Sequence, residues 1–200
     1  LEQEAVKDLM LSYRKAVQTA LAGGDWSTAD EVLDSIKKYQ TQVGSAVLPP
    51  PMKRKAEIFL NRASIFIRAG LTYFMVGLVL LVLGFLRIFW SKIKLDWLAT
   101  LLAVLLGLAF LFHTFGLAVR WYVSGHAPWS NGYESMIYIA WATLLAGLIF
   151  AKRDPMPLAA TSVLAGLTLM VAHLNWMDPQ ITNLVPVLRS YWLMIHVSMI

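Results

Sequence analysis

Two kinds of hydrophobic pattern divide this sequence. Over residues 2–39, apolar side chains recur every three or four positions, which is the repeat of one face of an amphipathic helix. The repeat predicts one helix over residues 2–21 and a second one ending near Tyr39, separated by Gly23 and Gly24. The prolines at 49–51 stop this pattern, and the residues from 53 to 68 predict a basic amphipathic helix.

Beyond residue 68 the pattern changes to long apolar stretches. The first reaches 22 residues, or about 33 Å of helix, which is enough to cross a membrane. We expect four complete transmembrane helices and the start of a fifth, over residues 69–90, 97–121, 135–151, 157–174 and 191–200. The predicted fold class is therefore all-α: a polytopic α-helical membrane protein, preceded by a small extracytoplasmic helical region.

Composition supports this division of the chain. Of the 200 residues, 58% are hydrophobic and 14% are charged, whereas a soluble domain has about 25% charged residues. We place an extracytoplasmic amphipathic helical region at residues 1–68, where most charges lie, and a membrane domain at residues 69–200. The net charge of +5 does not indicate nucleic acid, because the cations lie in a mixed-charge region and in short loops. The start at Leu1 and the apolar run up to Ile200 predict an internal piece of a longer protein.

Lysine and arginine in short loops predict the direction of the spans, because loops rich in them stay on the cytoplasmic side. Loop 87–96 and turn 152–154 are basic, so the loops at 120–134 and 175–190 and the N-terminal region are expected outside. One cluster conflicts with this orientation, since five cations between residues 53 and 68 precede the first span. We discount the cluster because a long soluble segment crosses a membrane largely regardless of its charge.

Among the side chains of this sequence, the histidines are the best candidates for binding a metal or a cofactor. His113, His126, His173 and His196 all fall at or toward the predicted outer face, and imidazole is a common ligand of haem iron. Tryptophans near the span boundaries predict an aromatic belt. The sequence has no cysteine, which excludes disulfides and thiolate metal sites, and its carboxylates flank the spans, which disfavours an ion path through the bilayer.

Two long segments on the predicted outer side carry a family resemblance. They read RWYVSGHAPWSNGYES over residues 120–135 and WMDPQITNLVPVLRSYWLMIHVS over residues 176–198. Both resemble the cytochrome c biogenesis protein family CcsA/ResC, the haem-handling membrane subunit of the system II cytochrome c synthase. The helical region before the first span resembles the external part of a fused CcsB-CcsA (ResB-ResC) protein, so a fragment of such a protein is expected.

The resemblance implies that the complete protein carries haem b across a bacterial inner (cytoplasmic) membrane. It would present the haem on the periplasmic side to apocytochrome c, where thioether bonds form with the cysteines of a Cys-x-x-Cys-His acceptor. The whole protein would then be a cytochrome c synthase of the haem lyase type, and this fragment alone is expected to be inactive. The implied partners are apocytochrome c, a CcsB/ResB-like part, fused or separate, and the lipid bilayer.

The resemblance assigns one ligand within this sequence. His196, in the segment Leu193-Met-Ile-His-Val197, is implied as an axial ligand of the external haem iron. Pocket candidates beside it are Trp129 and Trp192 for the haem disc, and Arg120 and Arg189 for its propionates, since charge-assisted pairs are strong. No catalytic residue is assigned.

Two other functions stay open from the residues alone. A haem-b electron-transfer subunit would need two histidines of different spans at matching depth, and only His113 and His173 come close to this. A structural membrane subunit would need no ligand at all.

Overall fold

The computed structural model describes residues 2–45, 48–89, 96–151, 154–174 and 177–181 and the single positions 190, 192, 193 and 196. Within this part of the chain all regular structure is α-helical, in agreement with the predicted fold class. The chain forms two compact units, Leu1–Pro50 and Pro51–Ile200. The boundary between the compact units falls at Pro50, because the helix that follows Pro50 packs against the membrane helices. The predicted division at residue 68, between an extracytoplasmic region and a membrane domain, stays a prediction.

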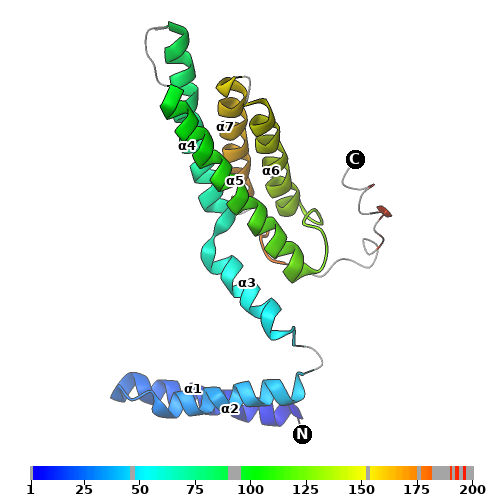
Figure 1. Ribbon diagram of the computed structural model, residues 1–200. Helices are drawn as coiled ribbons and strands as arrows, with labels where there is room; N and C mark the ends of the chain where they lie inside the picture. Colours follow the sequence, from blue (N-terminus) through cyan, green and yellow to red (C-terminus); the bar gives the residue numbers. More distant parts are fainter. Residues whose placement is uncertain are drawn as a thin grey trace. The chain divides into compact units, whose positions relative to one another are not determined.

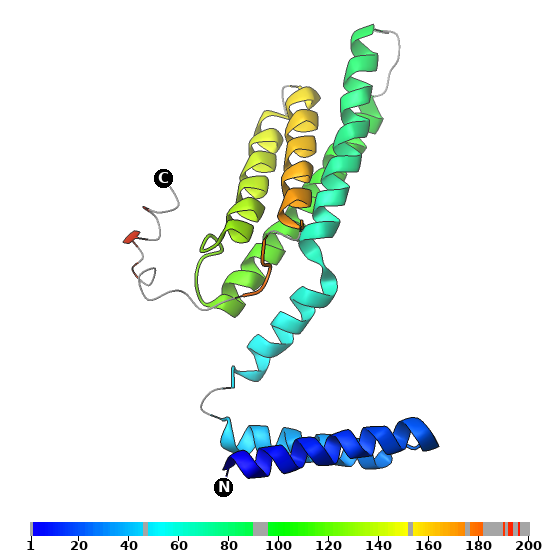
Figure 2. The same cartoon turned by 180° about the vertical axis from the view of Figure 1, so that it is seen from behind.

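The first unit is a helical hairpin made of α1 (Glu2–Gly23) and α2 (Ser27–Val43), which lie side by side (Figure 1, Figure 2). Small side chains let the two helices approach, since Ala16, Ala20 and Ala29 are buried between them together with Ile36. The turn between the helices needs a glycine, because Gly24 has a φ of 76°, a left-handed conformation that is costly for other residues. The two amphipathic helices predicted from the sequence are thus present.

The second unit contains α3 (Pro51–Ala63), α4 (Ile65–Phe89), α5 (Asp96–Ser124), α6 (Gly132–Phe150) and α7 (Pro155–Ala172). The last four are long and apolar enough to cross a membrane, which confirms the four complete spans. The basic helix expected to continue to residue 68 instead ends at Ala63, because Ser64 adopts a positive φ of 46° and breaks the chain into α3 and α4. Most of the predicted fifth span, 191–200, lies outside the described residues.

The core of the second unit is built around α7, which packs against both α4 and α6 (Figure 1). Helices in a membrane gain little from hydrophobic burial against each other, so close contact through small residues becomes the main source of attraction. Glycines of α4 recur every seven residues on the side that faces α7, and each lacks the space for a Cβ. The pairs across this contact are Gly70 with Leu169, Gly77 with Ser162, and Gly84 with Met156.

The two ends of the four-helix bundle differ in chemistry. One end, here called the Arg87 end, carries an exposed ion pair of 3.0 Å between Arg87 and Asp96, which joins α4 to α5. There Asp154 caps α7, its Oδ1 accepting a hydrogen bond of 2.9 Å from the backbone N–H of Met156. The other end, here called the Arg120 end, holds the end of α5, the loop 125–131, the start of α6 and residues 173, 174 and 177–181. The two basic loops predicted from the sequence, 87–96 and 152–154, belong to the Arg87 end and lie partly outside the described residues.

Candidate functional site

A buried ion pair is the main polar feature of the Arg120 end. The side chains of Arg120, in the last turns of α5, and Glu134, in the first turn of α6, are 3% and 1% exposed. Arg120 Nε donates to Glu134 Oε1 at 2.9 Å. A buried charge is tolerated only when it is paired and its remaining polar atoms are satisfied, so the surroundings of both groups decide what this pair does.

Glu134 is held by the loop that precedes α6. Its Oε2 accepts hydrogen bonds from the backbone N–H of Ser130 at 2.8 Å and from the Ser130 hydroxyl at 2.6 Å. Its own backbone N–H donates to Asn131 Oδ1 at 2.8 Å, which makes Asn131 the N-cap of the helix. Loop and helix start are therefore fixed by one carboxylate and one cap. The motif Asn131-x-x-Glu134 is the signal in the sequence that could have placed this helix start at Gly132.

Arg120 reaches in the opposite direction, to the segment that follows α7. Its Nη1 donates to the Pro179 carbonyl oxygen at 2.9 Å, and its Nη2 to the Gln180 carbonyl oxygen at 3.3 Å. The guanidinium carbon also lies 5.2 Å from the ring centroid of Tyr133. Arg120 thus ties together the end of α5, the start of α6 and the segment after α7. The guanidinium is therefore already engaged in holding three segments together. Its predicted contact with a haem propionate stays a prediction.

An apolar groove lies beside this network, between α5 and α6. Its volume is about 260 Å³, and Trp129 is one of the side chains in its wall. Trp129 contacts Tyr138 edge to face at 5.3 Å, and Tyr138 stacks on Trp141 at 5.8 Å. The groove is lined by Thr114, Leu117, Ala118, Trp121, Ala127, Pro128, Trp129, Tyr138 and Trp141. Of the pocket candidates from the sequence, Trp129 is thus in an aromatic environment suited to a flat apolar group.

His113 lies in the middle of the bundle and is fully buried. Its Nδ1 is 3.2 Å from the Tyr73 hydroxyl of α4, which also lies 3.3 Å from the Ala109 carbonyl oxygen. Its Nε2 is buried without a hydrogen-bond partner in the described part of the chain. Aromatic rings pack against the imidazole, Phe66 at 5.5 Å and Tyr73 at 5.8 Å.

The Tyr73–His113 contact leads to a prediction for stability. Replacing Tyr73 by phenylalanine removes the polar partner of a buried imidazole and is expected to lower the free energy of unfolding by about 1–3 kcal/mol. Denaturant titration in mixed micelles would measure this, with Tyr122→Phe, at an exposed position, as the matched control. Equal effects of the two substitutions would show that the Tyr73 hydroxyl contributes nothing.

Two further histidines lie at the Arg120 end. The Nδ1 of His126 lies 3.1 Å from the Ala127 carbonyl oxygen. The Nδ1 of His173 lies 2.9 Å from the Leu169 carbonyl oxygen. Because a carbonyl oxygen only accepts, each of these hydrogen bonds requires the ring proton on Nδ1. The Nε2 of His126 is buried and, among the described residues, has no hydrogen-bond partner. The described residues contain no group of three or more metal-ligating side chains.

The structure does not favour a bis-histidine haem site between His113 and His173. Rings of two other residues fill the path between them: Phe66 contacts His113 at 5.5 Å and Tyr133 at 6.3 Å, and Tyr133 contacts His173 at 5.8 Å. A haem between them would have to displace this packed row of rings.

The remaining site candidates fall in the last part of the chain. Trp192 and His196 are both exposed, and most residues around them lie outside the described part. Arg189 is itself outside the described residues. Their predicted roles in a haem pocket therefore stay predictions.

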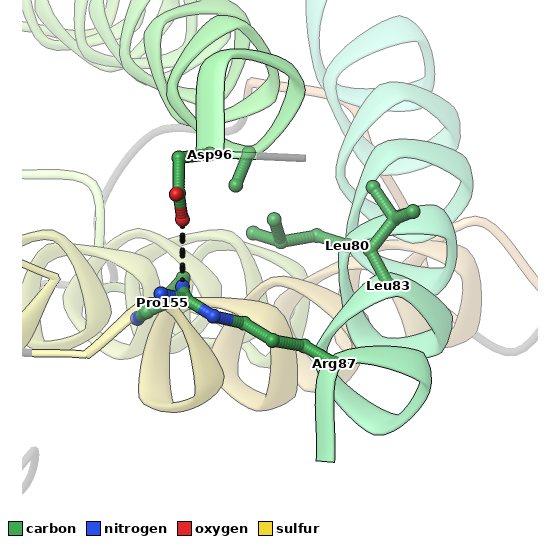
Figure 3. A pocket seen from close by; sticks show the side chains of 7 residues that line it. Leu80, Leu83, Arg87, Asp96 and Pro155 are labelled. Carbon is green, nitrogen blue, oxygen red and sulfur yellow. Dashed lines mark ion pairs between the residues drawn. The ribbon is translucent and has the colours of Figure 1, made fainter. Parts of the chain in front are cut away.

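The Arg87 end holds a second hollow, formed by α4, α5 and α7. Figure 3 shows Leu80, Leu83 and Pro155 around it, with the Arg87–Asp96 ion pair at its edge. Its volume of about 20 Å³ has room for roughly one water molecule. This cavity is too small for an organic substrate. A wider hollow of about 390 Å³ at the same end is lined by Gly84, Arg87, Ile88, Asp154, Pro155 and Met156. Its lining has no aromatic side chain, so the groove at the Arg120 end is the better candidate for a flat apolar ligand.

Comparison with known proteins shows which family the chain resembles. Residues 129–200 match the family described as cytochrome C assembly protein, a range that includes Trp129, Arg189, Trp192 and His196. The chain is 41% identical over 170 residues to protein NrfI of Wolinella succinogenes, which covers 85% of the chain and 19% of NrfI. Since only 132 residues follow residue 68, that match must extend into the helical region before the expected first span.

Relatives named cytochrome c biogenesis protein CcsA match a shorter part. The protein of a Synechococcus species is 43% identical over 100 residues, covering 48% of the chain and 31% of that protein. The protein of Prochlorococcus marinus is 38% identical over 106 residues, covering 51% of the chain and 33% of that protein. The chain therefore spans about a fifth to a third of these relatives. By these matches the chain belongs to the CcsA-type cytochrome c biogenesis proteins.

Proposed function

We propose that this chain is part of a multi-pass membrane protein that handles haem during cytochrome c maturation. The observation that carries the proposal is the match of residues 129–200 to the cytochrome C assembly protein family, joined by relatives named for cytochrome c biogenesis. Four membrane-crossing helices and an aromatic groove at one end of them support it. The whole protein exports haem b and presents it for covalent attachment to apocytochrome c.

The orientation follows from the same proposal. The Arg120 end, the N-terminal hairpin and His196 face the periplasmic side of a bacterial inner membrane, and the Arg87 end faces the cytoplasm. This places the aromatic groove, the ion pair of Arg120 and Glu134 and His196 on one side of the membrane. A CcsB/ResB-like part, fused or separate, completes the protein.

The chemistry of the chain suits the presentation of haem to an acceptor that carries the thiols. His196 would hold the haem iron through its imidazole, and Trp129 and Trp192 would offer apolar rings to the haem. Arg189 is the arginine that we place at a propionate, and Arg120 remains a second candidate. The sequence has no cysteine, so both sulfur atoms of the thioethers come from the acceptor's Cys-x-x-Cys-His motif.

Haem absorption of the purified whole protein tests the role of His196. We expect His196→Ala to lose the low-spin haem spectrum and added imidazole to restore it, because free imidazole can occupy the vacated axial position. His126→Ala is the matched control, since it removes a histidine of the same predicted side. Retention of the whole haem spectrum in His196→Ala would contradict the assignment, and loss only in His113→Ala or His173→Ala would favour a haem-b electron-transfer subunit.

A further inference from the structure

We propose that α3 lies along the membrane surface and that its cations bind the phosphates of anionic phospholipids. The helix has only 13 residues but carries four cations and a single carboxylate, that of Glu57. The function proposed above makes no use of this helix. The inference therefore stands on the geometry and charge of α3 alone. The cations are Lys53, Arg54, Lys55 and Arg62.

One face of α3 is fixed to the last turns of α5. Leu60 is buried in the shared core, and Phe59 contacts Phe115 edge to face at 6.0 Å. The Nζ of Lys53 lies 5.8 Å from the ring centroid of Tyr122. Because α5 spans the membrane, these contacts hold α3 at the level of the last turns of α5, where the α5 side chains Trp121 and Tyr122 are exposed. Tryptophan and tyrosine at a span end mark the headgroup region.

The length of α4 places α3 outside the hydrocarbon core. With 25 residues, α4 alone is about 37 Å long, whereas the hydrocarbon core is about 30 Å thick. The break at Ser64 then turns the chain, and Figure 1 and Figure 2 show α3 directed away from the axis of α4. A straight continuation would carry α3 into water, whereas this bend allows it to follow the surface.

The outward side of α3 combines apolar and cationic groups. Ile58 and Met52 are 48% and 68% exposed. The cations Arg54 and Lys55 are exposed among them, as is Arg62. No carboxylate of the described residues forms an ion pair with these three cations.

This mixture fits the boundary between headgroups and acyl chains. There apolar side chains enter the lipid while long cationic side chains extend to the phosphates. An acidic protein partner would neutralise the cations but leave the interleaved apolar groups without a matching surface. The lipid surface is therefore the partner that accounts for both.

The proposal also resolves a conflict in the charge pattern. Five cations between residues 53 and 68 count against an outside location of this segment by the positive-inside rule. Anionic lipids attract basic segments beside a span on whichever leaflet they occur. The four of these cations that belong to α3 are then ligands for lipid at the Arg120 end and do not indicate the orientation of the spans.

A spin label on α3 tests the proposal. The chain has no cysteine, so Ile58→Cys gives one labelling site in the full 200-residue chain. We would reconstitute the labelled protein in phosphatidylcholine vesicles with increasing phosphatidylglycerol and compare label accessibility to oxygen and to a water-soluble nickel chelate. The expected result is a label at headgroup depth that moves deeper as phosphatidylglycerol rises and returns outward in high salt.

Substitution of the cations tests whether they cause the response of the label to phosphatidylglycerol. The triple variant Arg54→Gln, Lys55→Gln, Arg62→Gln should bind the anionic surface roughly a hundredfold less tightly, since each cation near the surface contributes about fivefold. Its label should therefore no longer move deeper as phosphatidylglycerol rises. The matched control changes Lys7, Arg14 and Lys15 of α1 to Gln, which removes the same charge from exposed positions and should shift nothing. The pair Arg54→Lys, Arg62→Lys keeps the charge and should retain the response.

Three outcomes would overturn the proposal. The first is a label that the nickel chelate reaches equally at every phosphatidylglycerol fraction, which would leave α3 facing water and its cations open to an acidic protein. The second is an equal loss of the lipid response in the α1 control, which would mean that the net charge of the chain causes the response and not the position of the cations on α3. The third is a triple variant that keeps its circular dichroism and also its full lipid response.

Discussion

Arg120→Gln is expected to lower the free energy of unfolding by about 3–5 kcal/mol, which is the usual cost of leaving a buried charge without its partner. The substitution strands the carboxylate of Glu134, whose side chain is 1% exposed, and removes the donors that satisfy the Pro179 and Gln180 carbonyls. Denaturant titration of the whole protein in mixed micelles would measure the loss. Arg120→Lys should recover only part of it, because an ammonium group cannot reproduce the fork that reaches three acceptors.

A double-mutant cycle separates the pair from its surroundings. Glu134→Gln alone strands the guanidinium, whereas Arg120→Gln with Glu134→Gln leaves no buried charge, so the double variant should be destabilised by less than the sum of the single ones. Additive losses would contradict the coupling inferred from the 2.9 Å contact.

The same variants test whether Arg120 also meets a haem propionate. If the network is its whole role, haem occupancy should fall only in proportion to the loss of folded protein, and Glu134→Gln should behave as Arg120→Gln does. Loss of haem in a variant of Arg120 whose stability is unchanged would instead support the propionate contact. The comparison needs the whole protein, since this chain spans a fifth to a third of its relatives.

Periodicity and charge were enough to predict the helices of this chain, and tertiary contacts explain where the prediction differed. The apolar stretches gave the four spans because a helix must be continuously apolar to cross lipid. The break at Ser64 was not predictable, since serine rarely adopts a positive φ and nothing in the local pattern requires it. It depends on the packing of α3 against α5.

The candidate site was less accessible to sequence reasoning. From the sequence, Arg120 was a candidate for a propionate contact and Glu134 was one of the carboxylates that flank the spans. Their ion pair was missed because 14 positions separate them and no local pattern pairs residues across a loop. The Pro179 and Gln180 carbonyls carry no side-chain signal at all. The glycines at 70, 77 and 84 share a spacing of seven that marks one helix face. This spacing is a sequence signal for close helix packing that the predictions from the sequence did not use.

Gly166→Ala is expected to lower the free energy of unfolding by roughly 1–3 kcal/mol, the usual cost of overpacking a tight contact. Gly166 lies on α7 where the helix meets α4, and a Cβ there would lie 2.6 Å from the backbone nitrogen of Phe74. Backbone atoms cannot rotate away as a side chain does, so α4 and α7 would have to separate. Gly166→Leu should cost more, and the same titration in mixed micelles would measure both losses.

Gly107→Ala provides the matched control for this prediction. Gly107 is also inside a membrane helix, but a Cβ built there meets no atom within 4 Å. Alanine favours helix over glycine by about 1 kcal/mol, so this substitution should be neutral or stabilising. Since both variants make the same chemical change in a helix, the difference between them measures the α4–α7 contact alone. Equal stabilities of the two variants would mean that the small residues of α7 do not set the distance between these spans.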